Sequence, residues 1–248
     1  MAWDKSGLMT FCLNLLFPPR CCVCEEVTPV KTAICPECLQ SLPKELLEQE
    51  RCSVCGKPNG SCVCRERPFH FSYCTSAFCY DHNTHALIEK LKTLPDSLVA
   101  GQLAELMAEA LTVNSPVDAY IFDAVTEVPM ALTQIQKRGH NQAKTLAQKI
   151  AEKMKLSYID SPIDCAEDKK TQHTLTYHER FVNAEHSYRL RPAAFCSGRI
   201  LLVDDVMTTG ATLDRCAALL LRCGANEVVC LTAATTLRWQ DNVQLLIN

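Results

Sequence analysis

The chain has 248 residues, enough for one large domain or for a medium domain joined to a small one. Its formal net charge of −3 gives no electrostatic indication of a dedicated nucleic-acid-binding protein, although a local basic patch is compatible with it. Apolar residues make up 48% of the sequence and charged residues 21%, which excludes an intrinsically disordered chain. No apolar run reaches the length of about 18 residues that would predict a membrane span.

The first apolar stretch runs from residue 8 to residue 17. A signal peptide would begin with basic residues and end at a small-residue cleavage site, but Asp4 and Lys5 cancel here and no such site follows. With helical spacing the apolar side chains form one face, composed of Leu8, Phe11, Leu15 and Leu16. We therefore expect a short docking helix, in a cytoplasmic protein.

The number of cysteines is unusually high. There are 17, and eight of them form four close pairs before residue 65. Three pairs are C-x2-C knuckles and the fourth is C-x-C, a spacing that lets thiolates surround a zinc ion. The predicted metal ligands are Cys21, Cys24, Cys35, Cys38, Cys52, Cys55, Cys62 and Cys64.

The sequence leaves three points about these cysteines open. The pairs are compatible with two zinc ions, with one zinc ion or with disulfides, and Cys22 competes with Cys21 as the partner of Cys24. A closed site of four thiolates has no position for a water molecule, so zinc there would stabilise a small segment rather than catalyse. The remaining cysteines lie mostly in strand or helix patterns, and we interpret them as small buried apolar residues.

A change of pattern near Arg67 and Pro68 predicts two parts, a cysteine-rich zinc-binding segment at 1–67 and a larger domain at 68–248. The larger part alternates strand-like and helix-like segments, which is typical of an α/β fold with a mostly parallel sheet flanked by helices. Strands are expected at 73–80, 119–129, 199–205 and 227–234, and helices at 85–92, 97–111, 141–155 and 211–225.

The most informative stretch is ILLVDDVMTTGATLD at residues 200–214, where a buried strand runs into a threonine-rich turn. Ligands of parallel sheets bind beyond the carboxyl ends of the strands, and such a turn before a helix offers a phosphate both hydroxyl and amide donors. No lysine follows Gly210, so this is not a Walker loop. The adjacent carboxylates of Asp204 and Asp205 suit a group with neighbouring hydroxyls. The turn therefore predicts a 5-phosphorylated ribose as the ligand.

This stretch resembles the 5-phosphoribosyl-1-pyrophosphate (PRPP) signature of type I phosphoribosyltransferases, in which paired acids follow an apolar strand and precede a T-T/S-G-x-T loop. The resemblance implies a type I phosphoribosyltransferase-like sheet. It also implies that Asp204 and Asp205 hold the ribose hydroxyls and that the loop from Thr208 to Thr212 holds the 5-phosphate. Mg²⁺ is expected together with PRPP, because a departing pyrophosphate needs cations near it.

Three further features are similar to the ComF-like (ComF/GntX) competence proteins, and they extend the resemblance to nearly the whole chain. The first is the cysteine knuckles after LLFPPRC, and the second is KRGHNQA at 137–143, which has His140 where an aromatic residue is usual. The third is QHTLTYHERFVN at 172–183, which keeps Gln172, Leu175, Arg180 and Asn183. The resemblance implies a role in natural competence, that is, in DNA uptake and transformation.

Positive charge for the phosphates of PRPP is expected near the turn 127–131, where such folds place the pyrophosphate loop. Arg138, beside Lys137, and Arg180 can supply that charge, although each can also be an ordinary surface or ion-paired arginine. We assign catalytic roles to Asp204, Asp205 and Arg138. The predicted PRPP-binding residues are Pro129, Met130, Lys137, Arg138, Arg180, Asp204, Asp205, Val206, Met207, Thr208, Thr209, Gly210, Ala211 and Thr212.

Two interpretations of the site stay open. In the first, the protein is a Mg²⁺-dependent enzyme that transfers phosphoribose from PRPP to an acceptor, for which the sequence shows no base-specific pocket. In the second, it is a non-catalytic PRPP or nucleotide-binding module that handles incoming single-stranded DNA or docks DNA uptake and recombination proteins. A metabolic phosphoribosyltransferase unrelated to DNA is a third alternative.

Overall fold

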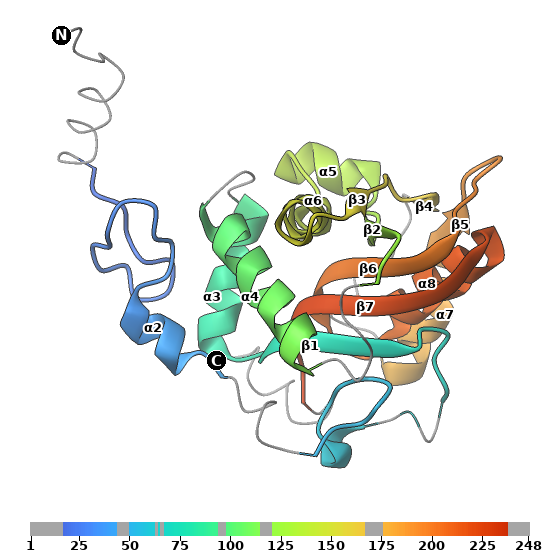
Figure 1. Ribbon diagram of the computed structural model, residues 1–248, viewed down its shortest axis with the longest axis horizontal. Helices are drawn as coiled ribbons and strands as arrows, with labels where there is room; N and C mark the ends of the chain where they lie inside the picture. The colour runs from blue at the N-terminus through green and yellow to red at the C-terminus, as the bar shows by residue number, and fades with distance from the viewer. Residues whose placement is uncertain are drawn as a thin grey trace, which may run out of the picture.

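The computed structural model describes residues 17–43, 50–62, 64, 67–93, 98–114, 121–166 and 176–237 (Figure 1). The helix expected over residues 8–16 lies outside these residues, as do Gln172 and Leu175 of the QHTLTYHERFVN stretch. Within the part of the chain that is described, no helix is both long enough and apolar enough to cross a membrane.

Five parallel strands form the central sheet, in the order β1-β7-β6-β2-β3 (Figure 1). Their bounds are β1 Tyr73–Cys79, β2 Ala124–Glu127, β3 Ser157–Tyr158, β6 Gly198–Met207 and β7 Ala225–Thr235. Every residue of β1 and β2 is buried, as expected for strands covered on both faces. The α/β fold with a parallel sheet is therefore confirmed, with the strand expected at 119–129 limited to its central residues.

Helices cover both faces of the sheet, and strand β6 shows how its side chains divide between them. Leu201 and Val203 enter the core beneath one set of helices, whereas Ile200 and Leu202 enter the opposite core. The first set is α3 His82–Thr93, α4 Leu98–Asn114 and α6 Gln142–Met154; across the sheet α8 Ala211–Cys223 packs with α7 Tyr177–Ser187 beside it. The sheet thus has the continuous apolar strands and two-sided cover that the sequence predicts.

Several elements were not expected from the sequence. They are α2 Pro36–Ser41, the 3-10 helix η2 Asn59–Ser61, α5 Leu132–Arg138, the edge strand β3, α7, and an antiparallel pair made of β4 Ile163–Cys165 and β5 Tyr188–Leu190. Helix α7 begins with a capping box, in which the hydroxyl of Thr176 accepts from the backbone N–H of Glu179 and the Glu179 carboxylate accepts in return.

The two cysteine-rich ribbons pack on the larger domain at different places (Figure 1). The first ribbon, residues 17–43, reaches α4, where the side-chain oxygen of Gln102 accepts from the backbone N–H groups of Ala33 and Ile34, both at 3.1 Å. The second ribbon, residues 50–64, lies against β1, where the N–H of Cys74 donates to the carbonyl of Val54 at 2.7 Å. Each ribbon therefore has its own anchor on the domain.

The segment after the second ribbon is fixed by one buried carboxylate. Asp214, in the first turn of α8, is 3% exposed and accepts from both the backbone N–H of His70, at 2.7 Å, and its ring nitrogen, at 2.8 Å. The guanidinium of Arg67 lies 3.9 Å from the same carboxylate and over the ring of Phe181, 4.2 Å from its centroid. These contacts join the ribbon to the helix that follows the threonine-rich turn.

Gly56 is the point at which the second ribbon comes closest to the sheet. It has a φ of +66°, and a Cβ added to it would overlap the carbonyl oxygen of Cys74 on β1. We expect Gly56→Ala to lower the free energy of unfolding by about 2 kcal/mol or more. Gly60→Ala is the matched control, because a Cβ there meets open space, and its effect should stay within about 0.5 kcal/mol. Chemical denaturation of zinc-loaded protein measures both, and equal stabilities would contradict the close approach.

Candidate ligand site and metal centres

The acidic pair lies at the carboxyl end of β6, on the edge of the sheet where ligands of parallel sheets bind. The carboxylates of Asp204 and Asp205 are half-buried and accept from the next backbone N–H groups: Asp205 N–H donates to Asp204 at 2.9 Å, and Val206 N–H donates to Asp205 at 2.8 Å. These bonds fix the orientation of the two side chains at the edge of the sheet.

The turn between β6 and α8 has the form of an anion site. Gly210, with a φ of +82°, caps α8, so the first turn of the helix begins at Ala211, directly after the threonine-rich loop. The Thr209 hydroxyl is buried and accepts from Ala211 N–H at 3.3 Å. Met207, the last residue of β6, is held through its carbonyl by the hydroxyl of Thr235 at 3.0 Å. The predicted loop is therefore a rigid connection between two buried elements, and Val206, Thr208 and Thr212 are half-buried along it.

Arg180 reaches this loop from α7. Its Nη1 donates to the hydroxyl of Thr208 at 3.1 Å, although the two residues are 28 positions apart. Burial lowers the pKa of the Arg180 guanidinium to about 10, which still leaves it charged near neutral pH. The structure therefore brings together the loop and the arginine that the sequence analysis assigned to PRPP.

The turn after β2 lies beside the acidic pair, because β2 is the neighbour of β6 and Glu127 is in register with Val203. Pro129 and Met130 follow directly, so the expected pyrophosphate turn and the acidic pair share one edge of the sheet. Asn141 caps α6 and donates from Nδ2 to the carbonyl of Val128 at 3.0 Å, which holds this turn.

The RGHNQ stretch connects this turn to the acidic pair through Gln142, which the sequence analysis did not single out. Nε2 of Gln142 donates to the Asp205 carboxylate at 2.9 Å, and its Oε1 accepts from Arg138 at 3.5 Å. Arg138 and Lys137 are exposed at the end of α5. His140, in place of the usual aromatic residue, contacts the carbonyl of Leu91 on α3 at 2.9 Å.

Tyr80 is a second residue near the acidic pair that the sequence did not indicate. It follows β1, and its hydroxyl lies 2.7 Å from Nδ1 of His85. Burial and the charges of Glu89 and Asp205 raise the pKa of the Tyr80 hydroxyl. A tyrosine at the end of a strand has no motif around it, so only the packing of β1 against β7 brings it here.

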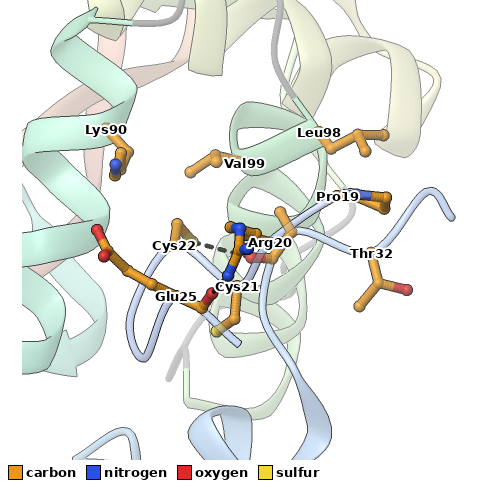
Figure 2. Close-up of a pocket in the computed structure, with 10 residues that line it drawn as sticks. Pro19, Arg20, Cys21, Cys22, Glu25, Thr32, Lys90, Leu98 and Val99 are labelled. Carbon is orange, nitrogen blue, oxygen red and sulfur yellow. Dashed lines mark hydrogen bonds between the residues drawn. The ribbon is translucent and has the colours of Figure 1, made fainter. Parts of the chain in front are cut away.

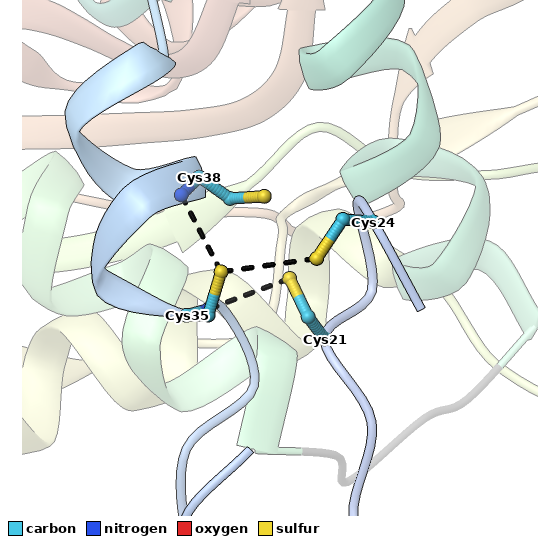
Figure 3. Close-up of side chains that lie close together, drawn as sticks. All are labelled: Cys21, Cys24, Cys35 and Cys38. Atoms are coloured by element: carbon cyan, nitrogen blue, oxygen red, sulfur yellow. Dashed lines mark hydrogen bonds between the residues drawn. The ribbon is translucent and has the colours of Figure 1, made fainter. Parts of the chain in front are cut away.

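The first cysteine cluster has the geometry of a tetrathiolate metal site (Figure 3). The sulfurs of Cys21, Cys24, Cys35 and Cys38 all lie within 4.8 Å of one another. Cys22 is not part of the cluster, because its thiol donates to the carbonyl of Ala33 at 3.0 Å. The competition between Cys21 and Cys22 is thereby settled in favour of the C-x2-C knuckle.

The second cluster is formed by Cys52, Cys55, Cys62 and Cys64, whose sulfurs also lie within 4.8 Å of one another. The C-x-C pair thus takes the place of a second knuckle. Between the two cysteine pairs of this cluster, Nζ of Lys57 donates to the backbone carbonyl of Thr208 in the ligand loop at 2.6 Å.

Backbone N–H groups prepare one sulfur of each cluster to carry negative charge. Burial by itself would raise the pKa of the Cys21 thiol. Hydrogen bonds from the backbone of Cys24, Cys35 and Val23 outweigh burial and lower this pKa to about 6. At Cys52, burial is outweighed in the same way by the backbone of Cys55 and Val54, and the pKa is lowered to about 7. Four sulfurs at these separations fit tetrahedral Zn²⁺ and leave no open position, so both clusters are structural zinc sites.

A cavity of about 360 Å³ lies between the first ribbon and helices α3 and α4 (Figure 2). Cys22 and Arg20 line it from the ribbon, and Lys90, Leu98 and Val99 line it from the two helices. It is set apart from the edge of the sheet that carries the acidic pair, so it adds nothing to the ligand site described above.

Comparison with known families agrees with this architecture. Residues 12–80 match the double zinc ribbon domain, and residues 102–241 match the phosphoribosyl transferase domain. The chain belongs to the phosphoribosyl transferase family, with a double zinc ribbon joined to that domain.

Individual relatives narrow this assignment. The DNA utilization protein YhgH of Salmonella typhi is 29% identical over 210 residues, covering 84% of this chain and 86% of the relative. YhgH of Escherichia coli K12 is 28% identical over 211 residues, with the same coverage of 84% and 86%. Competence protein F of Haemophilus influenzae is 30% identical over 108 residues, covering 43% of this chain and 47% of the relative. The protein is thus a ComF-like member of the family.

The number of zinc ions is open to direct measurement. We expect elemental analysis to find two zinc ions per chain, because both clusters offer four sulfurs. Cys24→Ser and Cys62→Ser should each lose one ion, whereas Cys22→Ser, whose sulfur bonds a carbonyl, should keep both. A wild-type protein with a single zinc ion, or the loss of zinc from the Cys22 variant, would show that the clusters are assigned wrongly.

Proposed function

We propose that the site at the carboxyl end of β6 binds PRPP together with Mg²⁺, and that the protein uses this ligand in DNA uptake or utilization in the cytoplasm. The observation that carries the proposal is the combination at one sheet edge of two fixed carboxylates and a threonine-rich loop held by a buried arginine. A 5-phosphorylated ribose needs both of these features, the carboxylates for its hydroxyls and the loop for its phosphate, and few other ligands do.

Each part of PRPP has a matching group in the site. The 5-phosphate would occupy the loop, where the N–H groups at the start of α8, the threonine hydroxyls and Arg180 supply donors and positive charge. Asp204 and Asp205 would accept from the ribose hydroxyls. The pyrophosphate would then extend toward Pro129 and Arg138, and Mg²⁺ would neutralise part of its charge.

Turnover of PRPP is the form of this proposal that makes the protein an enzyme. In that reaction an acceptor nucleophile forms a bond to C1 of the ribose as the bond to pyrophosphate breaks, and pyrophosphate leaves with the bonding electrons. The chain from Arg138 through Gln142 to Asp205 supports it, since it links a cation on the leaving-group side to the carboxylate on the ribose side. Recognition without turnover uses the same contacts and needs no acceptor.

The biological role rests on the relatives. Proteins named for DNA utilization match 84% of this chain, and a protein named for competence matches 43% of it. The two zinc ribbons, of which the second lies beside the ligand site, provide surfaces for single-stranded DNA or for DNA-processing proteins. A role in DNA uptake therefore fits better than a purely metabolic phosphoribosyltransferase.

Binding of PRPP can be tested with two variants and a control. Asp205→Asn should weaken binding of PRPP with Mg²⁺, as should Arg180→Gln, each by about tenfold or more, because each removes a charge-assisted hydrogen bond. Asp164→Asn, an exposed carboxylate on β4 that pairs with Arg191, should bind like the wild type. Titration calorimetry measures the affinities. Wild-type protein that shows no heat with PRPP would rule out the proposed ligand. If PRPP binds, a measurement of pyrophosphate release with candidate acceptors distinguishes turnover from recognition.

Contact with single-stranded DNA predicts a strong dependence on salt. If the protein touches about three phosphates, its affinity should fall more than tenfold between roughly 50 and 200 mM salt, because bound phosphates release counterions. Fluorescence anisotropy with a labelled oligonucleotide measures this, and an oligomer of the same bases on an uncharged backbone is the control. If adding the protein leaves the anisotropy of the oligonucleotide unchanged at the lowest salt, the protein does not bind single-stranded DNA, and the ribbons are better explained as surfaces that bind other proteins.

A further inference from the structure

Lys57 is a cation that the second zinc ribbon places inside the ligand site. It follows the knuckle Cys52–Cys55 and is only 5% exposed, although lysine side chains usually extend into water. Its Nζ donates to the carbonyl oxygen of Thr208 at 2.6 Å, across 151 positions of sequence. A buried ammonium that ends on a loop carbonyl indicates that the loop requires this contact.

The position of Lys57 is set by the zinc-binding turn. Its carbonyl accepts from Cys52 N–H at 2.9 Å, and Gly56 N–H donates to the carbonyl of Cys52 at 3.0 Å. The N–H of Lys57 also bonds the sulfur of Cys55, one of the four metal ligands. Zinc that holds these sulfurs therefore holds the backbone from which the lysine extends.

At the other end of the contact, Lys57 helps to orient one peptide group of the loop, whose carbonyl also accepts from the hydroxyl of Thr236 at the longer distance of 3.4 Å. In a planar trans peptide the N–H points opposite to the C=O. Because the carbonyl of Thr208 points to Lys57, the N–H of Thr209 points the other way, as an anion-binding loop requires. The hydroxyl of Thr208 is held separately by Arg180 at 3.1 Å. Two cations thus fix this residue, one through its backbone and one through its side chain.

The charges of the two sites also complement one another. A zinc ion bound by four thiolates has a net negative charge, and Lys57 lies between that charge and a loop built to receive a phosphate. The described residues of the first ribbon are instead anchored at Gln102 on α4 and, through the carbonyl of Pro43, at Cys79 at the end of β1.

We infer that Lys57 is a positioning residue that couples zinc at the second ribbon to the 5-phosphate loop, so that this zinc ion and PRPP bind cooperatively. The inference rests on the proposed binding of PRPP. The zinc ion of the first ribbon is not part of the coupling. By linkage, the ligand must also stabilise the second zinc ion by the same factor by which that ion favours the ligand.

The first test compares Lys57→Met with Lys31→Met, which makes the same change of charge in an exposed turn of the first ribbon. Titration calorimetry should show PRPP binding about tenfold weaker in Lys57→Met and unchanged in Lys31→Met. Elemental analysis should find both variants loaded with zinc as the wild type is. Wild-type affinity in Lys57→Met would overturn the coupling while leaving PRPP as the ligand, whereas a wild type that does not bind PRPP would overturn both.

The second test measures the rate of zinc release. If the role of Lys57 were merely structural, PRPP would not change this rate. A chelating, metal-sensitive dye follows the loss of zinc from the wild type with and without PRPP and Mg²⁺. We expect PRPP to slow release of one of the two ions, and Cys24→Ser, which lacks the first ion, to keep this protection. Equal release rates with and without PRPP in the wild type would overturn the inference even if Lys57→Met failed to fold.

Discussion

Parallel pairing of β6 with both β2 and β7 is the constraint on which the site depends. Because parallel strands end at the same edge of a sheet, the acidic pair, the turn after β2 and the threonines that end β7 all meet there. The apolar alternation of β6 fixes this register: a shift by one residue would exchange Leu201 and Ile200 between two packed cores. The chemistry of the site is thus secured by the packing beneath it.

The zinc ribbons solve a different physical problem. Neither segment is large enough to bury an apolar core of its own, so metal–thiolate bonds replace that core. Once folded, each ribbon behaves as a rigid side group of the larger domain. The first is attached to α4 by paired hydrogen bonds to Gln102, and the second is pressed against β1 where Gly56 leaves no room for a side chain. Only the second lies near enough to influence the ligand loop.

The features that the sequence predicts correctly are those formed by residues close together in the chain. The knuckles, the strand-to-helix turn after Asp205 and the apolar periodicity of the main helices are each complete within about twenty residues, so pattern alone indicates them. The contacts of Gln142 and Lys57 could not be predicted in this way, because each side chain bonds a partner more than sixty positions away. Helix α7 was overlooked although Thr176 and Glu179 carry a capping-box signal, since its short apolar face is interrupted by charged residues.

The carboxylate of Asp214 has a practical consequence for anyone who divides this protein into parts. It is buried at the start of α8 and receives its hydrogen bonds from His70, with Arg67 nearby, both beyond the last zinc ligand. A fragment that starts at Phe71 would bury this charge without those donors, and a charge left unpaired in this way is costly. A fragment of the larger domain that keeps these partners therefore has to begin no later than residue 67.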